Sequence, residues 1–228
     1  MKPYYKRNYY ENRDRSQFIS KVYLLLCIAV ILLVLFEVIL FRSGLAQPMA
    51  RRMLGVPWLL ILGGFVLIGW FARRIVYRVK SKIAQYGSLL LYIIAKTIIL
   101  APLLYLADMN APGSIRYAAQ FTIISFIGLS VIAFTTRKDF SFLRGFLRWA
   151  GLIAFLLIIG AITLQFSLGV YFSIGMIALA GASILYDTSR ILRYYSDDRY
   201  VAAATALFAS VALMFWYALR IFRRFGRR

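Results

Sequence analysis

Few side chains in this sequence can do chemistry, and the acids within apolar stretches are the most informative of them. Asp187 ends a long apolar run in the stretch ILYDTSRIL and is followed by Arg190. Ser183, Asp187 and Arg190 are spaced i, i+4 and i+7, so they share one face of a helix. Asp187 could be a working charge in an ion pathway, or a helix-end acid that pairs with Arg190 for about 0.2–0.5 kcal/mol. The residues alone leave both interpretations open.

Two more charged residues lie within apolar stretches. Lys96 stands near the middle of the stretch 86–106, and Glu37 stands near the end of an earlier one. A charge at mid-helix in a membrane costs about 2.5–3.5 kcal/mol on insertion scales. For Lys96 we favour a pathway-lining residue, or the partner of a buried acid, over a lysine that bends to the inner face. For Glu37 we favour the interface, or a pair with Arg42 or Arg51, over a cavity.

Composition places the chain in a membrane. Of its 228 residues, 62% are hydrophobic and 16% are charged, and its mean hydropathy is +0.76. A soluble domain of this size could not bury so much apolar surface. The net charge of +20 would suggest nucleic acid in a soluble protein, but basic residues that flank membrane spans explain it here. The expected partners are the lipid bilayer and anionic lipids at its inner face, with no nucleic acid.

The sequence contains few residues or motifs of the kinds that enzymes use for catalysis. It has no histidine, and its one cysteine, Cys27, lies in an apolar stretch, so neither a disulfide nor a zinc site is expected. It contains no G-x-S-x-G, P-loop or G-x-G-x-x-G motif, and no visible nucleophile–base pair. We therefore predict a non-enzymatic protein without a cofactor.

Seven apolar segments predict membrane helices. They lie at 22–41, 56–71, 86–106, 117–135, 147–166, 168–187 and 201–219. The first is longer than the apolar core of a signal peptide, so we interpret it as an uncleaved helix. Short connections predict one all-α, seven-helix membrane domain over 22–222. A polar and basic tail at 1–21 precedes it, and a basic tail at 223–228 follows it.

Positive charge predicts the orientation of these helices. With the N-terminus in the cytosol, most Lys and Arg residues fall in inner segments, and the outer loops hold only Arg42, Arg51, Arg52 and Arg116. Seven crossings place the arginine-rich C-terminus outside, against this rule. A re-entrant last helix is the alternative to seven crossings.

The last apolar segment contains small residues at regular intervals. Ala202, Ala206 and Ser210 recur every four residues, and small residues let membrane helices approach closely. This pattern predicts that the segment 201–219 packs centrally, against several neighbours.

Four stretches give the chain a family resemblance. They are SQFISKVY at 16–23, FTTRKDFSFLRGFL at 134–147, GASILYDTSRI at 181–191 and DRYVAAATALFASVALMFWYALRIF at 198–222. With these stretches in this order, the sequence resembles the transmembrane Bax inhibitor motif (Bax inhibitor-1) family, and the resemblance is to a bacterial member of that family. The resemblance implies six helices around a central, C-terminal seventh, and a bacterial cytoplasmic membrane as the location. It also implies an activity known for some members, a pH-sensitive Ca²⁺ leak.

The resemblance carries over only some functional residues. Family members with the leak have two aspartates that share a proton, and an arginine latches onto the pair. The proton is shared because two close carboxylates in a medium of low dielectric cannot both ionise easily. Asp187 matches the first aspartate and Arg73 matches the latch, but Ser210 stands in the place of the second aspartate. Our hypothesis is that Arg73, with Lys96 or Arg190, holds Asp187 ionised near neutral pH.

Two classes of function follow. The first is a leak channel for Ca²⁺ or other cations, with an aspartate–arginine latch at its inner mouth. The second is a non-conducting protein that binds and regulates membrane machinery, such as a membrane protease or a stress response, as some members of the resembled family are described. The first requires flux through the purified protein, and the second requires a stable membrane-protein partner. Neither ion selectivity nor oligomeric state follows from the sequence.

Overall fold

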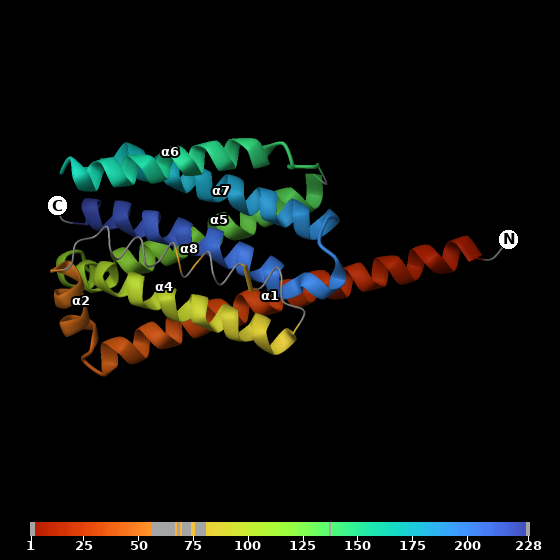
Figure 1. The fold of residues 1–228 in the computed structure, drawn as a ribbon, viewed down its shortest axis with the longest axis horizontal. Coiled ribbons are helices and arrows are strands. Elements are labelled where there is room, and N and C mark those ends of the chain that lie inside the picture. Colours follow the sequence, from red (N-terminus) through yellow and green to blue (C-terminus); the bar gives the residue numbers. More distant parts are fainter. Residues whose placement is uncertain are drawn as a thin grey trace.

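The computed structural model describes residues 3–55, 67, 69, 74–75, 81–136 and 138–226, and among these it contains helices and no strand. The helices are α1 (Pro3–Arg42), α2 (Ala46–Leu54), α4 (Lys82–Asn110), α5 (Ser114–Thr136), α6 (Leu143–Thr163), α7 (Val170–Arg193) and α8 (Tyr200–Phe225), with a 3₁₀ turn, η1 (Asp197–Arg199), before α8. Figure 1 shows the long helices side by side in one bundle.

Six of the described helices are long and apolar enough to cross a membrane. They are α1 from Arg15 onward, α4, α5, α6, α7 and α8. A bilayer offers no water to satisfy backbone groups, so a helix, which satisfies its own, is the form these segments take. The chain is thus an all-α, multi-pass integral membrane protein, as its composition predicts. The predicted second span, 56–71, lies almost entirely outside the described residues.

The helices extend beyond the predicted apolar segments. The backbone of α1 is helical from Pro3, so it continues through most of the segment that the sequence assigns to a tail. Helix α7 continues to Arg193, so Asp187 lies within the helix and not at its end. Arg190 and Arg193 occupy the last turn of α7, where basic side chains favour the helix because they face the negative end of its dipole.

One short helix has no counterpart among the predicted segments. Helix α2 lies in the connection after α1 and packs against α4. Ala46 and Ala50 are its buried contacts, whereas Arg51 and Arg52 are exposed. This division into an apolar and a basic face is typical of a helix that lies along the surface of a bundle or a membrane.

Helix α8 lies at the centre of the bundle. It packs against α1, α4, α5 and α7, and in Figure 1 it runs between the α6–α7 side and the α1–α4 side. Ala202, Ala203 and Ala204 are fully buried, which lets the surrounding backbones approach closely. This confirms the prediction of a central last helix from its small residues.

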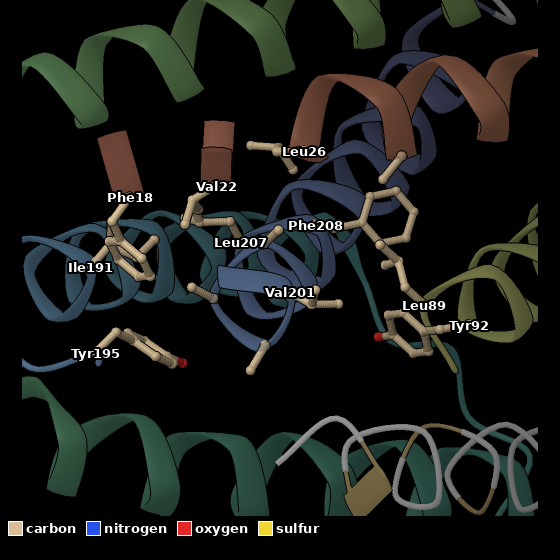
Figure 2. Packing of buried hydrophobic residues seen from close by; sticks show 14 of the residues in the cluster. Phe18, Val22, Leu26, Leu89, Tyr92, Ile191, Tyr195, Val201, Leu207 and Phe208 are labelled. Atoms are coloured by element: carbon tan, nitrogen blue, oxygen red, sulfur yellow. The ribbon is translucent and has the colours of Figure 1, made fainter. Parts of the chain in front are cut away.

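The largest buried cluster joins the first helix to the last two. Phe18, Val22 and Leu26 of α1 meet Ile191 of α7 and Leu207 of α8 in one contiguous set, and Figure 2 shows these side chains converging. The cluster therefore fixes the end of the bundle that holds Asp187. The stretch of α1 from Phe18 onward, the start of α8 and the end of α7 are packed together there.

Candidate functional site

The two positions that the sequence singles out on α7 and α8 lie in contact. Asp187 is 8% exposed and Ser210 is 7% exposed. The Ser210 hydroxyl donates a hydrogen bond of 3.0 Å to the Asp187 Oδ2 atom. A hydrogen bond to an ionised group contributes about 1.5–3 kcal/mol. Ser210 thus connects the central helix to the buried acid.

Three further hydroxyl groups, one of them on the residue that follows Asp187, face one another inside the bundle. Thr188 follows Asp187 directly on α7 and is fully buried, Ser130 is buried on α5, and Tyr23 lies largely buried on α1. The Tyr23 hydroxyl faces those of Ser130 and Thr188, and within the described part of the chain none of the three has a hydrogen bond of good geometry. They form a cluster of hydroxyl groups in an otherwise apolar bundle.

The end of α7 is held by an arginine from α1. The Arg15 guanidinium donates hydrogen bonds to the carbonyl oxygens of Ile191 at 2.5 Å, Tyr195 at 2.5 Å and Leu192 at 3.2 Å. The last carbonyl groups of a helix lack partners within the helix, so a donor from elsewhere must satisfy them. Arg15 does so one turn beyond Asp187. The sequence did not single out Arg15, because in the sequence Arg15 is one of several basic residues before a membrane span.

The loop between α5 and α6 docks onto the same end of α7. The backbone N–H of Phe140 donates to the Ser189 hydroxyl at 3.2 Å, and the Tyr194 hydroxyl donates to the Asp139 carboxylate. The Asp139 carboxylate also accepts a bond of 2.9 Å from the backbone N–H of Ser141. The stretches 134–147 and 181–191, which carry the family resemblance, therefore meet here.

These contacts shift the titration of the loop carboxyl group. The hydrogen bond from Tyr194 and then that from the Ser141 backbone hold the pKa of Asp139 below its ordinary value. The same contact raises the pKa of Tyr194, because Asp139 accepts its proton in a hydrogen bond. Because the pKa of Asp139 is lower in the folded chain than in the unfolded chain, the contact stabilises the fold fully at pH values above the unfolded-state pKa. This stabilisation is lost as the pH falls through the folded-state pKa.

We expect the Tyr194→Phe variant to release this loop without unfolding the bundle. The variant removes one hydroxyl on an exposed side chain and keeps the ring. Hydrogen exchange at the Ser141 amide should become faster in the variant at neutral pH. In the parent chain exchange at this amide, corrected for the intrinsic effect of pH, should rise as acid protonates Asp139. Equal protection of this amide in parent and variant at neutral pH would contradict the assignment.

Arg190 and Lys96 both lie against aromatic rings. The Arg190 guanidinium is 4.8 Å from the ring centroid of Tyr195 and 5.5 Å from that of Tyr186. The Lys96 Nζ atom lies 5.7 Å from the ring centroid of Tyr92. Such cation–π contacts stabilise a charge where little water reaches it. Arg73, the expected latch, lies outside the described residues.

Lys96 also lines a cavity of about 380 Å³ between α4, α6, α7 and α8. Trp216, Tyr217 and Arg220 line the same cavity. The Arg220 guanidinium donates a hydrogen bond of 2.8 Å to the carbonyl oxygen of Leu168, in the α6–α7 connection. Two basic side chains therefore face this cavity.

Glu37 has a different environment from the one that the sequence favoured. The residue is 8% exposed, and it lines a second cavity of about 500 Å³ instead of reaching the interface. Within the described part of the chain, neither of its carboxyl oxygens has a hydrogen-bond partner, so the expected pair with Arg42 or Arg51 is not formed. The reason is the rotation of α1, which turns Glu37 toward α4, α5 and α8.

Comparison with known proteins identifies the family. The family model described as "Inhibitor of apoptosis-promoting Bax1" matches residues 15–227. The chain belongs to the Bax inhibitor-1 family. Because the match begins at Arg15 and runs past the end of α8, it includes all six described helices that could cross a membrane, together with the arginine that holds α7.

Individual relatives of this Bax inhibitor-1 protein come from bacteria and plants. The chain is 35% identical over 130 residues to an uncharacterised protein of Pseudomonas aeruginosa, which covers 54% of this chain and 56% of that protein. It is 34% identical over 131 residues to an uncharacterised membrane protein of Vibrio cholerae, with the same coverage. A BI1-like protein of Arabidopsis thaliana is 27% identical over 227 residues, 95% of this chain and 84% of that protein. The match thus spans about half the length of each bacterial relative.

Proposed function

We propose that this Bax inhibitor-1 protein is a leak channel for Ca²⁺ or other cations, controlled at the buried contact between α7 and α8. The observation that carries the proposal is the hydrogen bond from Ser210 to the Asp187 carboxylate, inside the bundle. An acid at this depth is costly to bury and is most often functional in a membrane protein. The carboxylate of Asp187 is an oxygen ligand of the kind that Ca²⁺ prefers.

Control at this contact follows from the elements that it joins. Asp187 is carried by α7, whose last turn is held by Arg15 and whose end receives the α5–α6 loop. Ser210 is carried by the central helix, which packs against four described neighbours. A change in the Asp187–Ser210 contact therefore acts on two helices that the rest of the bundle restrains. In this proposal Arg73 latches onto Asp187, with Lys96 or Arg190 as the alternative cation.

The pH response is expected to be shallow. A pair of close acids shares a proton, but here the partner of Asp187 on α8 is a serine, which does not titrate near neutral pH. A nearby cation would keep Asp187 ionised over this range. The proposed topology places the N-terminus in the cytosol of a bacterium and the contact at the inner mouth, following the distribution of positive charge.

We expect the Asp187→Asn variant to leak Ca²⁺ roughly tenfold more slowly than the parent chain, because it removes a negative charge from the pathway and keeps the side-chain shape. The measurement is Ca²⁺ flux into liposomes that contain the purified protein, between about pH 5 and about pH 8. Asp198→Asn is the matched control, since Asp198 is an exposed acid outside the membrane-spanning helices. A steep response to pH near neutrality in the parent chain, lost in Asp187→Asn, would contradict a permanently ionised Asp187.

The second candidate is a non-conducting interaction protein that regulates a membrane protease or a stress response. The observation in its favour is the first part of α1, whose backbone extends beyond the bundle in Figure 1 and offers a surface to a partner. No flux at any pH, with a partner that co-purifies in a fixed ratio, would support this function over the channel. In both proposals the protein is not an enzyme and carries no cofactor.

A further inference from the structure

Glu37 is a buried acid that the proposed channel does not use. It lies on α1, away from the end of the bundle where Phe18 of α1 packs against Ile191 of α7, and it is 8% exposed. Within the described part of the chain, both of its carboxyl oxygens lack a hydrogen-bond partner. Leaving a buried polar group unsatisfied costs about 1–3 kcal/mol, and more for a charged group. A ligand that satisfied Glu37 would recover this cost.

The cavity in front of Glu37 has the size of a small-molecule site. Its volume of about 500 Å³ lies between α1, α4, α5 and α8, within the range of roughly 300–1,000 Å³ that is typical of such sites. Its wall is largely apolar and includes Leu33, Leu104, Phe208 and Phe215. A ligand of this cavity must therefore be mostly hydrocarbon.

The cavity also has a lateral side toward the lipid. Val34 and Val38 of α1 and Ile123 of α5 line it and are exposed on the surface of the bundle. In a membrane this surface faces acyl chains, so a hydrophobic ligand can enter from the bilayer between α1 and α5. No passage through water is needed.

The charged residues on the cavity wall further restrict the kind of ligand that fits. Besides Glu37, the charged residues that line the cavity are Arg42 and Asp108, both exposed and opposite in sign. Thr122 is the other polar residue on the wall, and its hydroxyl donates to the carbonyl oxygen of Ala118 at 2.7 Å. The site as a whole therefore presents one buried acid on an apolar wall.

A divalent cation fits this site poorly. Ca²⁺ takes about 6–8 oxygen ligands, and the described residues contain no group of three or more acidic, cysteine or histidine side chains that could hold a metal. A neutral or anionic lipid would leave Glu37 without a charged partner. An ammonium group, in contrast, both donates hydrogen bonds and neutralises a carboxylate.

We propose that this cavity binds an amphipathic amine, with the ammonium group on the Glu37 carboxylate and the hydrocarbon chain along the apolar wall. Binding is independent of conduction, because Asp187 and Ser210 do not line this cavity. The bundle has this ligand site whether or not the protein conducts ions.

The test uses the full chain in lipid nanodiscs and radiolabelled dodecylamine as the probe, with binding to empty nanodiscs subtracted. We expect saturable binding to the parent chain that Glu37→Gln weakens roughly tenfold or more, the loss expected for one charge-assisted hydrogen bond. Asp198→Asn, which removes an exposed acid elsewhere, should bind as the parent does. Excess dodecanol or dodecanoate should displace the amine poorly.

A second variant keeps Glu37 and fills part of the cavity. Ala119 lines the cavity and is half-buried, so Ala119→Phe should weaken binding although Glu37 is unchanged. Each variant is first shown to be monodisperse and to unfold at the temperature of the parent. Equal binding by Glu37→Gln and the parent, or equally tight binding of dodecanol, would overturn the proposal. Loss of flux in Asp187→Asn with intact amine binding separates this site from the channel.

Discussion

In the Ser210→Asp variant, the cation leak is expected to become steeply dependent on pH between about pH 5 and about pH 8, with a change of roughly tenfold over this range. Ser210 Oγ already lies 3.0 Å from Asp187 Oδ2, so an aspartate here would bring a second carboxyl group against the first. Two carboxylates this close in a medium of low dielectric cannot both ionise easily, and they share a proton near neutral pH. Protonation would then decide how α7 contacts α8.

The control for this variant separates charge from volume. Ser210→Asn adds a side chain of the same size as aspartate but no acid, so its leak should stay as flat with pH as that of the parent chain. The measurement is Ca²⁺ flux in liposomes at several pH values, for the parent and both variants. Identical pH profiles for Ser210→Asp and Ser210→Asn would show that the contact does not control conduction. A steep profile in the parent itself would show that the pH response does not need a second acid at position 210.

The Arg15→Met variant is expected to lose about 3 kcal/mol of stability, the largest loss that we predict for one side chain. Arg15 donates to three backbone carbonyl groups at the end of α7, and hydrogen bonds from charged groups contribute about 1.5–3 kcal/mol each, although such values do not add fully. Methionine keeps the apolar stem but leaves these carbonyls without their donor. The guanidinium also lies 4.9 Å from the ring centroid of Phe18, within the main cluster.

Arg15→Lys is the matched control for this prediction. Lysine keeps the charge, but a single ammonium group cannot reproduce the planar fork that reaches three carbonyl oxygens, so its stability should fall between those of the parent and Arg15→Met. Unfolding in detergent, followed by tryptophan fluorescence, gives the midpoints. If Arg15→Met unfolds with the same midpoint as the parent, Arg15 does not hold α7. A midpoint for Arg15→Lys equal to that of Arg15→Met would assign the effect to geometry alone.

Arg15 and Asp187 both act at one end of the bundle. Arg15 holds the last turn of α7, and Asp187 lies one turn before it, so weakening the first contact should also loosen the second. The docked α5–α6 loop lies at the same place, through Ser189 and Tyr194. This end therefore combines the buried acid with the contacts that restrain its helix.

Much of the fold could be predicted from the sequence because it depends on local composition. Apolar stretches of sufficient length must be helices in a bilayer, and the alanines of α8 predict close packing, so the multi-pass class and the central last helix both followed. Helix ends were less predictable. Asp187 looks like the end of an apolar run, yet α7 continues to Arg193, because Arg190 and Arg193 face the negative end of its dipole and Arg15 satisfies its last carbonyl groups.

The candidate site was predictable only in part. The family motifs placed Asp187 and Ser210 in register, and the structure brings them into hydrogen-bond contact. Arg15 and Glu37 show what the motifs do not contain. One basic residue before a membrane span resembles any other, and one acid near a span's end reads as an interfacial residue, until the neighbours that they face are known.

The sequence by itself determined that this chain is a helical membrane protein, which segments are apolar enough to span, and that its motifs belong to the Bax inhibitor-1 family. Only the tertiary structure decided that Arg15 satisfies the end of α7, that the α5–α6 loop docks on Ser189 and Tyr194, and that Glu37 faces a cavity. The reason is that hydropathy acts along the chain, whereas the rotation of each helix and the partners of its polar groups are set by packing between residues far apart in it.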